Sequence, residues 1–105
     1  MRKIRFKIVD FMHKKVEITG WLFTVKNRGY FVVHRNILNK KAWVVSDYLT
    51  GCGLGVPSIN TRRRAVLAAV FVIESKSQKF LKEKRIEALQ KFWGGKNGNQ
   101  KIYKS

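Results

Sequence analysis

Four segments with the composition of β-strands fill the first half of the chain, and the connections between them are short. The segments are residues 3–9, Val16–Lys26, Tyr30–Arg35 and Ala42–Tyr48. Each is rich in the β-branched and aromatic residues that are enriched in strands. Parallel neighbours need a crossover connection of roughly a dozen residues or more, and no connection here is that long. The sequence therefore predicts a four-stranded antiparallel β-meander.

The alternation of apolar and polar residues changes phase inside the second segment, at Gly20. Val16 and Ile18 share one parity, whereas Trp21 and Phe23 share the other. A β-bulge at Gly20 would explain the change, because a bulge inserts one extra residue into a strand. Burial of both faces of the strand would explain it equally well. The pattern leaves both explanations open.

The second half of the chain is predicted to be helical. A loop over Thr50–Asn60 carries three glycines and the only proline, and Asn60 or Thr61 is a good helix N-cap. The apolar run Ala65–Ile73 contains three alanines, which favours a helix, and Phe80–Trp93 has apolar residues at helical spacing. The sequence leaves open whether residues 62–93 form one helix or two.

These elements predict an α+β fold in which one long or two shorter C-terminal helices pack on one face of the meander. A chain of 105 residues fits one domain, which we place at residues 1–93. The Gly-, Asn- and Lys-rich segment 94–105 is predicted to be a flexible basic tail. A lone cysteine, Cys52, indicates a reducing compartment, and no apolar run approaches the ~20 residues of a membrane span. We therefore expect a cytoplasmic protein without a membrane partner.

The net charge is the strongest indication of function. It is +17, from 23 Lys and Arg against six Asp and Glu. Such an excess raises the local concentration of anionic partners, and nucleic acid is the commonest of these. The sequence therefore predicts a nucleic-acid-binding protein. It leaves open DNA or RNA, single or double strand, and the oligomeric state, a homodimer included.

Eight cations and three aromatic residues are the predicted binding residues: Lys3, Arg5, Lys7, Arg62, Arg63, Arg64, Lys82, Arg85, Trp21, Tyr30 and Trp43. The cations would contact phosphates, and the aromatic rings would stack on bases if the sheet leaves them exposed. The alternative for the rings is burial in the core. No recognition-helix motif is present, so we expect readout of shape and charge rather than of base sequence.

Two of the cation groups can be explained by the stability of the fold as well as by phosphate binding. Lys3, Arg5 and Lys7 fall on one strand face at a spacing of ~6–7 Å, which suits phosphates but also suits protection of an edge strand. The arginine run 62–64 begins a predicted helix, where backbone N–H groups favour anions and the helix dipole disfavours cations. The run is therefore either an anion site or a solvated charge cluster.

Nothing in the sequence indicates catalysis. Two histidines and one cysteine give no metal-ligand spacing, and the six acidic residues are scattered without a carboxylate pair. The glycine-rich segment Gly51–Gly55 does not fit a dinucleotide-binding motif, because Val56 stands where that motif needs glycine. We therefore expect no enzymatic activity, no cofactor and no metal.

The segment Trp43–Gly51, followed by Asn60–Ala65, resembles a pattern in many short phage and mobile-element proteins. In that pattern, W-x-V-[ST]-x-x-x-T-G, a strand leads through a glycine-containing loop to T-R-x-x-A at the start of an alanine-rich helix. The resemblance implies a small phage-type α+β domain. Such proteins include nucleic-acid binders and inhibitors of host defence. The alternative function is therefore a phage-encoded, anti-CRISPR-like inhibitor that acts in the host cell on a nuclease or its guide RNA complex.

Overall fold

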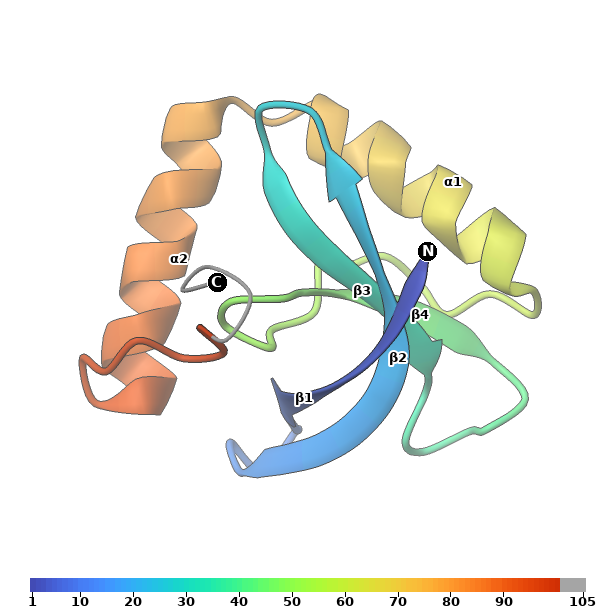
Figure 1. Ribbon diagram of the computed structural model, residues 1–105, viewed down its shortest axis with the longest axis horizontal. Coiled ribbons are helices and arrows are strands. Elements are labelled where there is room, and N and C mark those ends of the chain that lie inside the picture. Colours follow the sequence, from blue (N-terminus) through green and yellow to red (C-terminus); the bar gives the residue numbers. More distant parts are fainter. Residues whose placement is uncertain (101–105) are drawn as a thin grey trace.

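The computed structural model describes residues 1–100 and confirms the predicted α+β architecture (Figure 1). Its antiparallel sheet has the meander order β1-β2-β3-β4, and two helices follow. The elements are β1 (Arg2–Val9), β2 (Lys15–Val25), β3 (Gly29–Arg35), β4 (Trp43–Asp47), α1 (Arg62–Glu74) and α2 (Gln78–Trp93). No helix within residues 1–100 is long and apolar enough to cross a membrane.

Two serines separate the helices and settle the question of one helix or two. The Ser75 hydroxyl donates to the Val72 carbonyl, and its backbone N–H also closes the last turn of α1. The Ser77 side chain then accepts the backbone N–H of Phe80 at 3.0 Å and caps α2. Serine side chains that bond nearby backbone groups compete with helix continuation, so the chain turns between these residues.

Gly20 lies in β2 directly before Trp21 and Leu22, which pair with both β1 and β3. β2 pairs with β1 without interruption across Gly20, so the structure has no bulge there, and it pairs with β3 from Trp21 onward. A Cβ at Gly20 would overlap the Val32 side chain and lie 2.9 Å from the Val33 carbonyl oxygen. Trp21 and Phe23 pack against one apolar cluster of the interior and Val16 and Ile18 against another, so burial of both faces, the second explanation, is the correct one.

Two apolar clusters fill the interior, one on each face of the sheet. The helix-side core consists of Val25, Phe31, Val33, Trp43, Val45, Ala65, Ala69 and Ile73. The β1-side core consists of Phe6, Ile8, Val32 and Tyr48. β1 reaches past β2 to the turn after β4, where the Val9 N–H donates to the Gly51 carbonyl at 2.9 Å. The coiled sheet thus covers much of its own second face.

The packed part of the chain extends beyond Trp93, into the segment predicted as a tail. The Asn99 side chain accepts the Lys7 N–H and donates to the carbonyls of Lys7 and Tyr48. Its own N–H donates to the Leu49 carbonyl at 2.8 Å. Asn99 therefore bonds the outer edge of β1 much as a neighbouring strand would. Residues 101–105 of the predicted tail lie outside the described residues.

Candidate nucleic-acid interface

Two of the predicted cation groups meet at Trp21. Lys3 lies directly opposite Trp21 in the β1–β2 register, and its Nζ is 5.8 Å from the centroid of the Trp21 ring. The Arg62 guanidinium, from the start of α1, lies 4.8 Å from the same ring. Cations at these distances are attracted to the faces of aromatic rings. The fold therefore joins the strand cations to the helix cations, although 59 positions separate Lys3 from Arg62.

Trp43 extends this contact to a further arginine. The Trp43 ring meets the edge of Trp21 at a centroid distance of 5.6 Å, and the Arg35 guanidinium lies 4.0 Å from the Trp43 centroid. Sequence reasoning missed Arg35. The signal was the hairpin register, because Arg35 and Trp43 are direct cross-strand partners. We call this surface the basic strip, and its cations are Lys3, Arg5, Lys7, Arg35 and Arg62.

The strand part of the basic strip is exposed to solvent. Lys3, Arg5 and Lys7 are all exposed, and residues two apart on one strand face lie ~6–7 Å from each other. An ion pair of 3.5 Å joins Arg5 to Glu17, but both side chains are more than half exposed, so it adds little stability. Asn99 and Gly51 already cover the edge of β1 at residues 7–9. Edge protection is therefore a weak explanation for Lys7.

The first turn of α1 carries the unfavourable positive charge that the sequence predicted for this helix start. The Thr61 hydroxyl caps α1 by accepting the Arg64 N–H at 3.2 Å, which confirms one of the two predicted caps. No acidic residue lies in the first turn of α1, and Arg63 and Arg64 are exposed there. Arg62 is explained by its contacts with the tryptophan rings. Arg63 and Arg64 remain two cations at the positive end of a helix dipole.

The predicted aromatic residues do not share one open face. Trp43 is only 8% exposed and belongs to the helix-side core. Tyr30 is half-buried against the β1-side core, on the other face of the sheet. Trp21 is half-buried, with Lys3 and Arg62 beside its ring. The rings therefore support the cations of the basic strip more directly than they offer a platform for bases.

Arg85 and Lys82 lie away from the basic strip, on α2. Arg85 donates from Nε to the Asp47 carboxylate at 2.7 Å and from Nη2 to the Arg28 carbonyl at 2.6 Å. Its side chain is 20% exposed, so it acts as an anchor of α2. Lys82 is exposed on the same helix, which lies across the β2–β3 hairpin from α1 (Figure 1).

One polar pair has the residue types of a catalytic site but the burial of a core. His34 Nε2 lies 2.8 Å from the Ser46 hydroxyl, and Nδ1 lies 2.8 Å from the Arg35 carbonyl oxygen. A carbonyl only accepts, so Nδ1 carries the proton and the Ser46 hydroxyl donates to Nε2. Both residues are under 5% exposed, and burial lowers the pKa of His34. Residues 1–100 contain no cluster of three potential metal-ligating side chains.

Comparison with known proteins gives no family for this chain: no family model matches it, and neither the curated proteins nor the solved structures yield a significant match. The resemblance of Trp43–Gly51 and Asn60–Ala65 to phage proteins stays a prediction. The candidate interface rests on the geometry of the basic strip and on the charge of the chain.

Proposed function

We propose that the protein binds nucleic acid through phosphate contacts made by the basic strip. The observation that carries the proposal is the meeting of Lys3 and Arg62 at Trp21. It turns two cation groups from distant parts of the sequence into one continuous surface. A strip of cations on one face supplies the sequence-independent part of nucleic-acid affinity.

The spacing of the basic strip suits a polyanion. Lys7 lies four positions after Lys3 on β1, a distance of ~13 Å, and Arg62 and Arg35 continue the surface over the tryptophans. Ring contacts hold these two guanidinium groups in place before a ligand arrives. Less side-chain entropy is then lost on binding than with unrestrained arginines. Since the rings are largely covered, we expect no strong preference for particular bases.

Fluorescence anisotropy with labelled single-stranded DNA, duplex DNA and RNA, each at several salt concentrations, tests the proposal. The variant Lys3→Gln/Arg5→Gln/Arg62→Gln removes three cations of the strip. The matched control, Lys26→Gln/Lys79→Gln/Lys96→Gln, removes the same charge from exposed positions elsewhere. Each lost phosphate contact reduces the slope of log K against log salt by about 0.7–0.9. We expect a reduction of about two to three in the strip variant and a much smaller one in the control.

Equal losses in the two variants would contradict the proposal, because they would mean that net charge alone drives binding. Uniform binding that vanishes at physiological salt would contradict it as well. Circular dichroism and thermal unfolding of each variant show that a loss of binding does not come from a loss of fold.

A second candidate function is the anti-CRISPR-like inhibitor, and one observation favours it. Leu67 and Phe71 lie one turn apart on the outer face of α1 and are 62% and 78% exposed. Large exposed apolar side chains next to each other are typical of protein interfaces. A host protein partner would then bind tightly and lose affinity in Leu67→Ser/Phe71→Ser, whereas binding to free nucleic acid would not change. Pull-down of the protein partner with Leu67→Ser/Phe71→Ser and with Lys3→Gln/Arg5→Gln/Arg62→Gln separates the two functions.

A further inference from the structure

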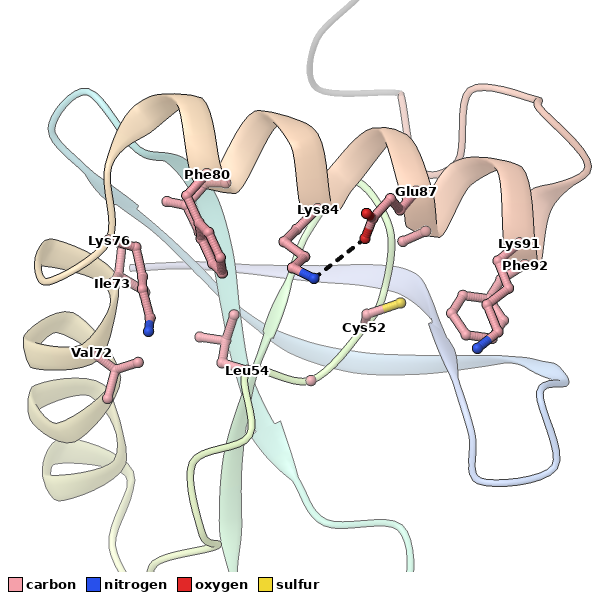
Figure 2. Close-up of a pocket in the computed structure, with 13 residues that line it drawn as sticks. Cys52, Leu54, Val72, Ile73, Lys76, Phe80, Lys84, Glu87, Lys91 and Phe92 are labelled. Carbon is pink, nitrogen blue, oxygen red and sulfur yellow. Dashed lines mark hydrogen bonds and ion pairs between the residues drawn. The ribbon is translucent and has the colours of Figure 1, made fainter.

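A groove of about 500 Å³ lies between α2, the C-terminal end of α1 and the loop that follows β4 (Figure 2). Its volume is in the range of natural small-molecule sites. Apolar side chains form most of its surface: Leu54, Val72, Ile73, Phe80, Leu81, Ala88 and Phe92. A smaller hollow of about 90 Å³ continues beneath α2 toward Phe31. The basic strip is elsewhere, so this groove is independent of the proposed function.

The groove exists because polar contacts hold α2 in place. α2 has no buried residue, in contrast to α1. Arg85 bonds Asp47, Trp93 Nε1 donates to the Thr50 carbonyl at 2.9 Å, and Lys15 Nζ donates to the Phe92 carbonyl at 2.9 Å. An open groove of this size with mainly apolar walls is suited to an apolar occupant from outside the chain.

The charges around the groove favour an anionic head group. Lys76 and Lys84 both place their ammonium groups near Phe80, at 5.3 and 5.6 Å from the ring centroid. Lys91 lines the other end of the groove. Glu87 is the only acidic residue in the lining, and its carboxylate lies 3.4 Å from Lys84 Nζ (Figure 2). Cations therefore outnumber acids by three to one, and two of them, Lys76 and Lys84, flank Phe80 at one end of the groove.

The shape and chemistry of the walls favour an alkyl chain as the body of the ligand. Phe92 lies twelve positions after Phe80 on α2, which makes the groove ~18 Å long at 1.5 Å per residue. The lining side chains offer few polar partners, so the backbone groups of a bound peptide would go unsatisfied. Cys52 also lines the groove, and burial raises the pKa of its thiol. The thiol therefore stays neutral and adds no charge to the walls.

We propose that this groove binds a long-chain alkyl carboxylate. The carboxylate lies between Lys76 and Lys84 beside Phe80, and the chain runs past Leu54 toward Phe92. Glu87 competes with the ligand for Lys84.

Isothermal titration calorimetry with acetate, hexanoate and decanoate, each below its micellar concentration, tests the proposal. Burial of each further methylene increases affinity by up to about fourfold, so decanoate should bind far more tightly than acetate. Lys84→Gln should weaken decanoate binding several-fold. The matched control, Lys79→Gln, removes the same charge from an exposed position of α2 outside the groove and should leave it unchanged.

Removal of the Glu87 carboxylate, which competes with the ligand for Lys84, should change the affinity in the opposite direction. Glu87→Gln should strengthen decanoate binding several-fold, whereas Glu83→Gln, which removes an acid outside the groove lining, should not. Ala88→Leu fills part of the groove and should weaken decanoate more than acetate, with thermal unfolding as the check on folding. The proposal is wrong if decanoate binds no more tightly than acetate, or if both lysine variants lose affinity equally.

Discussion

The two helices are capped in the same way but attached to the protein by different means. Thr61 and Ser77 each cap a helix by accepting the backbone N–H three residues later. α1 then buries Ala65, Ala69 and Ile73 in the helix-side core, whereas α2 buries no residue completely. The position of α1 follows from its apolar run, and that of α2 follows from a few polar contacts made through Arg85, Trp93 and Lys15.

Because they are attached by different means, the two helices should respond differently to mutation. Removal of a core side chain beneath α1 disturbs the sheet and the helix together, because they share one apolar cluster. Removal of an anchor of α2 should loosen that helix and leave the meander in place. Elements with few buried apolar contacts open at lower free energy than core elements.

The largest effect should come from Phe31→Ala. Phe31 is 0% exposed in the helix-side core, and truncation of such a phenylalanine costs about 3–5 kcal/mol of unfolding free energy. Urea denaturation followed by circular dichroism measures it. As a control, Leu67→Ala removes an apolar side chain that is 62% exposed and should cost about 0.5 kcal/mol or less. Similar costs for the two variants would contradict the assignment of the core.

Arg85→Ala should have the next largest effect, and this effect should fall mainly on α2. Without Arg85, the Asp47 carboxylate keeps its hydrogen bonds from Thr50 but loses its cation. Asp47 is only 6% exposed, so solvent does little to replace that cation. Loss of one partner of such a pair costs about 3 kcal/mol. Hydrogen exchange should show lost protection in α2 and retained protection in α1, and Lys82→Ala on the same helix should change neither. Equal loss in both helices would remove the distinction between them.

The sequence was sufficient to predict the parts of the fold that follow from local pattern. Alternation and short connections predicted the meander, and Thr61 was one of two predicted caps for the first helix. The phase change at Gly20 correctly indicated a strand buried on both faces, but it could not exclude a bulge. Choosing between these explanations needs the pairing of Gly20 with Ile4, which depends on the neighbouring strand.

Contacts between distant positions were beyond sequence reasoning. Arg85 has the same local pattern as the other cations of its helix, and only its contact with Asp47, 38 positions away, makes it an anchor. Lys3 and Arg62 were predicted as binding residues, but their meeting at Trp21 depends on how α1 lies on the sheet. Trp43 was a candidate for stacking because periodicity does not say which aromatic faces a helix covers.

A smaller effect should come from Asn99→Ala, which tests attachment by polar contacts at β1. Asn99 makes three side-chain hydrogen bonds, with Lys7 and Tyr48, and all three lie at or near the surface. Their combined removal should cost about 1–2 kcal/mol of unfolding free energy. The matched control is Asn97→Ala, at an exposed position two residues earlier. If both variants unfold at the same urea concentration as the parent, the Asn99 contacts do not stabilise β1.

The smallest effect should be a pH dependence that arises in the β1-side core rather than at α2. Burial lowers the pKa of His34, whose ring accepts the Ser46 hydroxyl only when Nε2 is unprotonated. The unfolded chain therefore takes up a proton that the folded chain does not, beginning near the ordinary pKa of about 6.5. The stabilisation that neutral His34 contributes is complete above that pH. It decreases as the pH drops from there toward the lowered pKa of His34 in the folded state.

Urea denaturation at pH 7.5, 6.5 and 5.5 measures this dependence, which corresponds to uptake of at most one proton on unfolding. His13→Gln should keep the slope, because His13 is exposed and its change leaves the core intact. His34→Gln should remove the slope while it lowers stability at all three pH values. Arg85→Ala should lower stability but keep the pH slope, since Arg85 bonds Asp47 and Arg28 rather than His34 or Ser46. A slope that survives His34→Gln would place the titrating group elsewhere and would separate pH sensitivity from the buried pair.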